Sequence, residues 1–158
     1  MPELEPLIII DLQCAFPVPA KLVQAIRRYS RRFPLRVFTR FENPEGSLFR
    51  KILELEACAP GSPDMNLLIE PDKGDLVFTK QSYGLAARHI AKLKRMGVKR
   101  ATVCGIETDA CVLGVMFSLF DAGIDCRVKP ELCWSSTGLH KEGLKIIKMQ
   151  FPPPKGKG

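Results

Sequence analysis

One stretch of the sequence, residues 101–123 (ATVCGIETDACVLGVMFSLFDAG), constrains the fold more than any other. Residues 101–104 are apolar and partly β-branched, which is typical of a strand buried on both faces of a sheet. Residues 112–120 are almost wholly apolar and are followed by Gly123, which predicts a buried helix with a glycine just after its end. A buried strand that leads within a few residues into a buried helix is typical of an α/β sheet, so we expect Cys111 to lie at the joint.

Cys111 occupies a position where a thiol can become reactive. Thr108 or Asp109 would cap the helix, which places Cys111 in the first helical turn, where backbone N–H groups lack helical partners and the dipole favours an anion. A cysteine thiolate is stabilised in such a place. Cysteine is also among the most buried residue types, so inert packing in an apolar helix is the alternative interpretation of the same pattern.

Length and composition limit the classes of protein to consider. A chain of 158 residues, 46% apolar and 26% charged, fits one globular domain. Its six cysteines show no close paired spacing and its two histidines lie far apart, so we expect neither a metal site nor a disulfide framework. The N-terminus is acidic where a signal peptide is basic, and no apolar run reaches the length of a membrane span. We therefore expect a cytoplasmic protein that does not contact the membrane.

The formal net charge of +7 raises the question of nucleic-acid binding. The basic residues lie at helical spacing among apolar ones, as in residues 24–33 (QAIRRYSRRF) and 91–100 (AKLKRMGVKR). This spacing is typical of a solvated helix face, and no recognised nucleic-acid motif accompanies it. We therefore expect no nucleic-acid partner.

Strands and helices alternate along the whole chain. We expect strands at 7–11, 35–41, 76–79, 101–104 and 126–128, the last of them cut by Pro130, and helices at 20–32, 47–56, 85–96, 112–120 and 138–149, with a loop at 57–66. Alternation of this kind predicts a three-layer αβα, Rossmann-like domain in which helices cover both faces of a parallel sheet. We assign the domain to residues 1–151 and expect the Pro- and Gly-rich tail, 152–158, to be disordered.

Three chemically distinct side chains fall at or just beyond the carboxyl ends of predicted strands. Asp11 ends the first strand, Lys80 follows the third, and Cys111 comes soon after the fourth. Ligands of parallel sheets bind outside the carboxyl ends of the strands. An acid, an amine and a thiol at this edge are what covalent catalysis requires, although Asp11 as a turn residue and Lys80 as a solvated strand end remain alternatives.

At this point the sequence resembles the isochorismatase-like cysteine hydrolases, a family that includes nicotinamidases, N-carbamoylsarcosine amidohydrolase and ureidoacrylate or biuret hydrolases. The resemblance covers residues 7–151, and His140 matches a recurrent family position. It is carried by IDLQ at 10–13, GD at 74–75, TK at 79–80 with Tyr83, VCGIETDACV at 103–112 and FDAG at 120–123.

The resemblance implies a role for each of these site residues. Cys111 would be the nucleophile, Asp11 the general base, and Lys80 the charged partner that holds the cysteine as a thiolate. The backbone N–H groups of Glu107 and Cys111 would form an oxyanion hole, with a cis peptide between Ile106 and Glu107.

Four further residues are expected to contact the substrate. Gln13 belongs to the first motif of the resemblance, and Phe16, Phe41 and Tyr83 are candidates for the pocket lining. Core packing is the alternative role for each of the three aromatic residues.

The chain also departs from parts of the family. Nicotinamidases carry an Asp-x-His and a further histidine that bind a metal after the second strand, whereas this chain has TRFEN at 39–43. We therefore expect no metal and no cofactor. Because true isochorismatases do not depend on a cysteine at this position, Cys111 indicates hydrolysis of a C–N bond in a small amide or carbamoyl substrate through a thioester.

Two other functions remain open. The chain could be a non-catalytic isochorismatase-like module that binds a protein or small-molecule partner, or a thiol redox protein that uses Cys111 with Cys104 or Cys133. We also expect a homo-oligomer, either a dimer or a tetramer.

Overall fold

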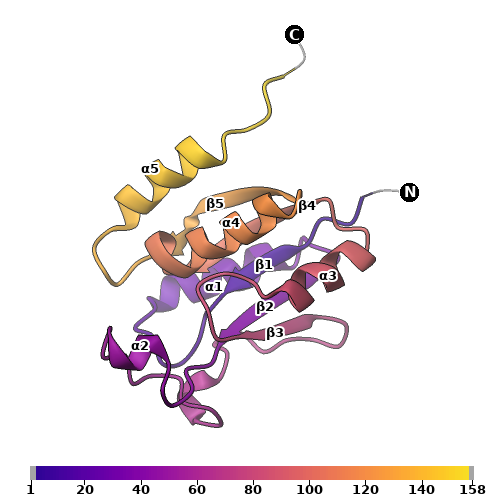
Figure 1. Ribbon diagram of the computed structural model, residues 1–158. Coiled ribbons are helices and arrows are strands. Elements are labelled where there is room, and N and C mark those ends of the chain that lie inside the picture. Colours follow the sequence, from indigo (N-terminus) through magenta and orange to yellow (C-terminus); the bar gives the residue numbers. More distant parts are fainter. Residues whose placement is uncertain (1–2, 157–158) are drawn as a thin grey trace.

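The computed structural model describes residues 3–156, which form a five-stranded parallel sheet (Figure 1). The strands lie in the order β3-β2-β1-β4-β5, and each neighbouring pair is parallel. The expected parallel α/β sheet is confirmed. Its strands are β1 (Leu7–Ile10), β2 (Arg36–Phe41), β3 (Leu76–Lys80), β4 (Arg100–Ile106) and β5 (Asp125–Trp134).

Helices cover both faces of this sheet. In Figure 1, α1 (Ala20–Ser30) lies behind the strands, whereas α3 (Ala87–Arg95) and α4 (Leu113–Asp121) lie in front of them. The chain leaves α5 (His140–Gln150) at Phe151, whose ring packs against two phenylalanine rings of α4 at centroid distances of 5.1 and 5.4 Å. The expected three-layer αβα architecture is therefore confirmed.

The central strand, β1, determines where the site lies. All four of its residues are fully buried. The chain moves outward from β1 through β2 to β3, then returns to add β4 and β5 on the other side of β1. In open parallel sheets a ligand crevice forms where the strand order reverses in this way, outside the carboxyl ends of the strands. Asp11 directly follows β1, and the turn that carries Cys111 follows β4.

β1 and β4 approach each other closely at Gly105. Gly105 pairs with Ile10 in the sheet register and has a φ of +118°. A Cβ at this position would lie 2.3 Å from the Ile10 carbonyl oxygen and 2.6 Å from its nitrogen. Such distances are far inside van der Waals contact, so only glycine fits here without moving the two strands apart.

The predicted helix at 47–56 is much shorter in the structure. It is a single turn, α2 (Leu48–Lys51), whose cap is Ser47, with Oγ accepting from the Arg50 backbone N–H. The helix ends because Glu54 adopts a positive φ and the Leu55 N–H turns back to the Phe49 carbonyl. A second short element in this region, η1 (Pro63–Met65), is a 3₁₀ turn within the expected loop.

The expectation that Pro130 cuts the last strand is wrong. β5 continues past Pro130 to Trp134, with an irregular register opposite the segment between Val103 and Gly105 of β4. β5 is an edge strand. Proline has no backbone N–H to donate to a neighbouring strand, so it is tolerated in an edge strand where the pairing is irregular.

The helix after β4 begins with a π-helical turn, η2 (Thr108–Val112), which continues directly into α4. Thr108 and Asp109 are thus the first helical residues, whereas we expected one of them to be the cap. The cap is Glu107, which makes no side-chain capping bond. Cys111 lies in the first turn, as expected. The peptide bond between Ile106 and Glu107 is cis, as the resemblance implied.

The expected domain boundary at residue 151 remains a prediction. Residues 152–156 carry no helix or strand, and the last two residues of the expected tail, 157–158, lie outside the described residues. Across residues 3–156 no helix combines the length and apolarity needed to cross a membrane.

Gly105→Ala should destabilise the fold far more than Gly97→Ala. Both glycines have positive φ, but a Cβ at Gly97 meets no atom within 4 Å. We expect a loss of about 1 kcal/mol in the free energy of unfolding for Gly97→Ala and of about 3 kcal/mol or more for Gly105→Ala, which adds overpacking between β1 and β4. Urea unfolding followed by circular dichroism measures both, and equal losses would contradict the close approach of these strands.

Candidate active site

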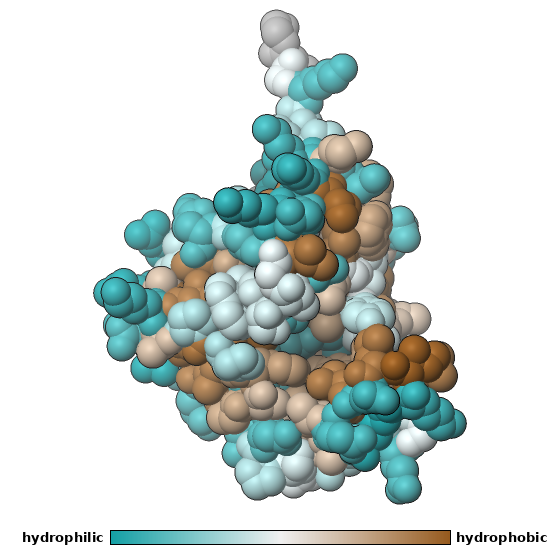
Figure 2. Space-filling model, turned by 90° about the vertical axis from the view of Figure 1, so that its left-hand side faces the viewer, coloured by the Kyte–Doolittle hydropathy of each residue, from teal (hydrophilic) through white to brown (hydrophobic). Residues whose placement is uncertain are grey.

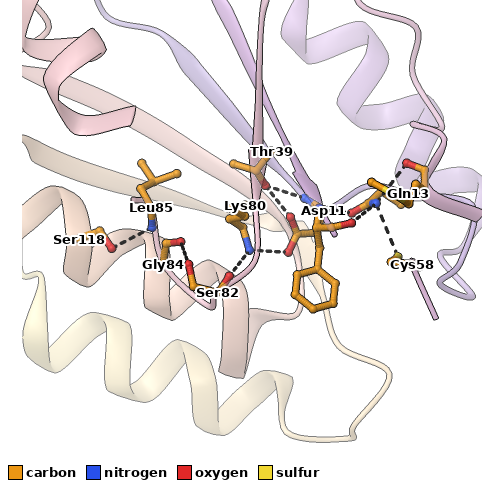
Figure 3. A network of polar contacts seen from close by, with 11 residues as sticks. Asp11, Gln13, Thr39, Cys58, Lys80, Ser82, Gly84, Leu85 and Ser118 are labelled. Atoms are coloured by element: carbon orange, nitrogen blue, oxygen red, sulfur yellow. Dashed lines mark hydrogen bonds and ion pairs between the residues drawn. The ribbon is translucent and has the colours of Figure 1, made fainter. Parts of the chain in front are cut away.

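Asp11 is held by two neighbours, one on each carboxylate oxygen (Figure 3). Thr39 Oγ1 of β2 donates to Asp11 Oδ1 at 2.6 Å, and Lys80 Nζ donates to Oδ2 at 2.9 Å. The Asp11 backbone N–H in turn donates to Thr39 Oγ1 at 3.0 Å. Asp11 has a φ of +49°, and its side chain is almost completely buried. The carboxylate is therefore fixed in orientation where the chain leaves β1.

Lys80 is the last residue of β3, and its side chain has no exposed surface. Besides Asp11, its ammonium group donates to the Ser82 carbonyl at 2.8 Å and lies 5.6 Å from the centre of the Phe41 ring. Burial acts to lower the pKa of Lys80, but the charge and hydrogen bond of Asp11, with a further contribution from Cys111, outweigh it and raise the pKa above its ordinary value. Lys80 is therefore a permanent buried cation at neutral pH.

The loop after β3 connects Lys80 to the helix that follows the cysteine. Gly84 and Gly114 make this connection tight, because a Cβ on Gly84 would lie 2.9 Å from the Gly114 carbonyl oxygen and a Cβ on Gly114 would lie 2.9 Å from Tyr83. The Leu85 N–H donates to Ser118 Oγ of α4 at 3.0 Å (Figure 3). These contacts join the loop after the edge strand β3, which ends at Lys80, to α4, which follows the turn that carries Cys111. Lys80 and Cys111 are thereby brought into one site.

Cys111 is partly buried in η2 and lines the main cavity. Burial raises the pKa of its thiol, the negative charge of Asp11 acts in the same direction, and Lys80 opposes both without reversing the shift. The sequence led us to expect a preformed thiolate held by Lys80. The structure instead favours a thiol that keeps its proton beside the Asp11 carboxylate.

Three polar contacts hold the turn that carries Cys111. The Thr108 N–H donates to Ser135 Oγ at 2.9 Å, and Ser135 Oγ donates to Asp109 Oδ1 at 2.7 Å. Thr108 Oγ1 lies 2.8 Å from His140 Nδ1 of α5, the histidine noted for its family position. The loop after β5 and the start of α5 therefore support this turn.

A cavity of about 720 Å³ opens above the carboxyl ends of the strands. Figure 2 looks onto the side of the molecule that carries α2, where apolar side chains border a hollowed part of the surface. Asp11, Cys111 and the expected contacts Phe16, Phe41 and Tyr83 all line the cavity. The sequence did not predict the other lining residues, except that the Glu107 backbone was expected in the oxyanion hole. They are Phe49, Leu53, Leu55, Ile106, Glu107, Asp109, Ala110, Leu113, Gly114, Phe117, Ser136 and Thr137.

Gln13 does not line this cavity, so the expectation that it contacts substrate is wrong. Its side chain is fully buried, donates from Nε2 to the carbonyls of Phe41 and Met65, and accepts from the Phe41 N–H. With both ends of the amide occupied by backbone groups, Gln13 joins the end of β2 to the loop at 57–66 (Figure 3).

Glu107 and Cys111, the expected oxyanion-hole residues, both line the cavity. Within residues 3–156 the Glu107 backbone N–H has no hydrogen-bond partner. Cys104 and Cys133, the partners of the redox alternative, are buried and do not line the cavity. Burial raises the pKa of Cys133 to about 12 and that of Cys104 well above its ordinary value.

The residues after β2 do not fit the metal site of a nicotinamidase. Glu42 accepts from Gln81 Nε2 at 2.8 Å, and the buried Asn43 donates its amide to the carbonyls of Leu55 and Ala57. No group of three His, Cys, Asp or Glu side chains in the described part of the chain could hold a metal ion.

Solved structures of known enzymes share this fold. A pyrazinamidase from Pyrococcus horikoshii in complex with zinc aligns with a TM-score of 0.83 and 22% identity, over 94% of this chain and 96% of that one. A nicotinamidase from Bacillus subtilis aligns with a TM-score of 0.79 and 16% identity, over 94% and 96% of the two chains. An isochorismatase-like hydrolase from Alkaliphilus metalliredigens gives a TM-score of 0.81 and 15% identity, over 92% and 91%.

At these identities the likeness establishes a common fold. No curated protein sequence matches the chain significantly. The family model described as the isochorismatase domain matches residues 7–153, which include every strand and helix described above. The chain therefore belongs to the isochorismatase family.

Proposed function

We propose that this isochorismatase-family hydrolase cleaves a C–N bond in a small amide or carbamoyl substrate through a covalent thioester on Cys111. The observation that carries the proposal is the convergence of three groups: Asp11 and Cys111 line one cavity, and Lys80 is buried behind Asp11. Asp11 and Lys80 form a buried ion pair of 2.9 Å, and Cys111 lies close enough for both charges to act on the pKa of its thiol. A nucleophile beside a fixed base is the minimum arrangement for covalent hydrolysis.

In the first half of the reaction, Cys111 Sγ attacks the carbonyl carbon of the substrate while Asp11 accepts the thiol proton. The oxygen becomes an oxyanion between the backbone N–H groups of Glu107 and Cys111. The intermediate then collapses, the C–N bond breaks, and the proton held by Asp11 passes to the leaving nitrogen. The products of this half are ammonia or an amine and the thioester.

In the second half, Asp11 removes a proton from a water molecule that attacks the thioester carbon. The carbon–sulfur bond breaks, the carboxylic or carbamic acid departs, and Cys111 recovers its proton from Asp11. Lys80 keeps its own proton throughout. Its role is to stabilise the negative charge, which passes from Asp11 to Cys111 and back.

The non-catalytic alternative predicts ligand binding without turnover.

We propose that the protein acts in the cytoplasm as a homo-oligomer. The oligomer is supported by exposed apolar side chains on and beside α2 and α5, including Leu48, Ile52 and Met149.

Replacing the nucleophile should abolish ammonia release from small amides. We expect Cys111→Ser to lower kcat/KM by about a thousandfold or more, because an alcohol beside Asp11 is a much weaker nucleophile. Cys104→Ala and Cys133→Ala serve as matched controls and should retain activity. Loss of activity in either control with its fold intact would favour the redox function instead.

The thiol of Cys111 should become more reactive with pH over the whole range from 6 to 9. Its raised pKa means that the thiolate fraction increases about tenfold per pH unit below that pKa. Iodoacetamide labelling in a Cys14→Ser background, which removes the exposed cysteine, measures the rate on the Cys111 peptide. A plateau below pH 8 would show instead that Lys80 holds a preformed thiolate.

Hydrolysis should survive exhaustive chelation. The side chains of Glu42 and Asn43, after β2, form hydrogen bonds within the protein, and the described residues contain no group of three side chains that could bind a metal ion. We expect unchanged kcat after dialysis against EDTA. Activity that is lost to the chelator and restored by zinc or manganese would contradict the metal-free mechanism.

A further inference from the structure

Glu107 has a backbone N–H that is free and a side chain that is not. It lines the cavity, and within residues 3–156 its N–H has no hydrogen-bond partner. Although Glu107 is the cap residue of η2, its carboxylate makes no capping bond to that helical turn. A donor that bonds to nothing keeps its orientation only if other contacts hold the residue that carries it.

Two consecutive serines of the loop after β5 provide such contacts. Ser136 holds the side chain, because its N–H donates to Glu107 Oε2 at 2.6 Å and its Oγ donates to Oε1 at 3.0 Å. Ser135 holds the backbone, because its Oγ accepts at 2.9 Å from the N–H of Thr108, the residue that follows Glu107. Glu107 is therefore fixed both through its carboxylate and through the next peptide group.

Asp109 fixes the orientation of the Ser135 hydroxyl. Ser135 Oγ donates to Asp109 Oδ1 at 2.7 Å, and Thr137 Oγ1 donates to both oxygens of the same carboxylate at 3.1 and 3.0 Å. A hydroxyl has a single proton, so donation to Asp109 leaves the Ser135 oxygen as the acceptor for the Thr108 N–H. The buried Ser135 hydroxyl thus has only one arrangement that satisfies both neighbours.

The start of α5 packs against the same turn. A Cβ on Gly143 would lie 3.0 Å from the Asp109 backbone nitrogen and 3.1 Å from the Thr108 carbonyl carbon. His140 Nδ1 lies 2.8 Å from Thr108 Oγ1. This close packing leaves the turn little room to move away from the loop at 135–139, which joins β5 to α5.

We infer that Ser135 and the Glu107 carboxylate are positioning residues, which hold the Glu107 N–H where the oxygen of the substrate becomes an oxyanion. The loop at 135–139 is then part of the active site. This inference rests on the proposed hydrolytic function and deepens it. Neither side chain touches the reacting atoms, so its contribution is confined to steps in which a carbonyl oxygen gains negative charge.

Alkylation and hydrolysis at the same thiol separate this role from general support of the fold. When iodoacetamide alkylates Cys111, a sulfur–carbon bond forms and iodide leaves, and no carbonyl oxygen gains charge. We expect Ser135→Ala to lower kcat for ammonia release from benzamide about tenfold or more with KM nearly unchanged. The alkylation rate of Cys111 should change less than about twofold.

Two further serine variants serve as controls. Ser135→Thr keeps the hydroxyl and should restore most of kcat. Ser30→Ala also removes a buried serine hydroxyl, but one that donates to the Arg27 carbonyl in α1, so both hydrolysis and alkylation should remain unchanged.

Two variants of Glu107 test the other contact and do not depend on the folding of Ser135→Ala. Glu107→Gln keeps one oxygen as an acceptor for Ser136, whereas Glu107→Ala removes both acceptors. Because both variants remove the negative charge, the difference between them reports the hydrogen bonds. We expect Glu107→Ala to lower kcat by at least about fivefold more than Glu107→Gln does, and equal losses would contradict a positioning role for the carboxylate.

Benzaldehyde provides a measurement that needs no turnover. Its addition to Cys111 forms a sulfur–carbon bond, and the carbonyl oxygen takes up the thiol proton, so the new hydroxyl lies where an oxyanion would form. Protection of Cys111 from iodoacetamide measures this addition. We expect Ser135→Ala to need at least about fivefold more benzaldehyde for half-protection than the unchanged protein.

The outcomes separate this inference from the function on which it rests. Equal loss of hydrolysis and alkylation in Ser135→Ala, or benzaldehyde protection that is absent or unaffected by this substitution, would overturn the inference. Protection that depends on Ser135 without ammonia release from any amide would reject the hydrolase and leave the positioning role in place. Hydrolysis that is unchanged in Ser135→Ala and in both Glu107 variants would do the reverse.

Discussion

The buried ion pair between Asp11 and Lys80 is the interaction on which the rest of the site depends. Lys80 has no exposed surface, and a buried ammonium without a partner would be severely destabilising. The surrounding structure supplies what it needs: the Asp11 carboxylate, the Ser82 carbonyl and the face of the Phe41 ring. In the proposed mechanism this costly ion pair fixes charge next to Cys111, where hydrolysis would require it.

Burial also determines the protonation state of Cys111, the proposed nucleophile. A cation and a helix N-terminus both favour a thiolate, and the sequence indicated both. Removal of Cys111 from water and the adjacent Asp11 charge act in the opposite direction and outweigh them. In the proposed mechanism Cys111 therefore starts as a thiol, and Asp11 acts as the proton acceptor as well as an electrostatic partner.

The sequence predicted the elements whose pattern is strong and local. The five strands, the αβα layers and the convergence of Asp11, Lys80 and Cys111 follow from apolar periodicity and from the geometry of parallel sheets. Thr39 was given no role and Gln13 was wrongly expected to contact substrate, because a polar residue in or beside a strand shows its partner only when a distant segment packs against it. The short α2 and the uninterrupted β5 depend likewise on tertiary contacts that override local preference, as does the presence of Phe49 and Phe117 in the lining of the cavity.

The central claim is a common covalent intermediate on Cys111, and partitioning between water and hydroxylamine tests it most directly. Benzamide and methyl benzoate share an acyl group and differ in leaving group, so both would form the same thioester. With hydroxylamine present, the account predicts one ratio of benzohydroxamate to benzoate for both substrates. Ratios that differ with the leaving group would contradict a shared thioester and indicate direct attack of water on the substrate.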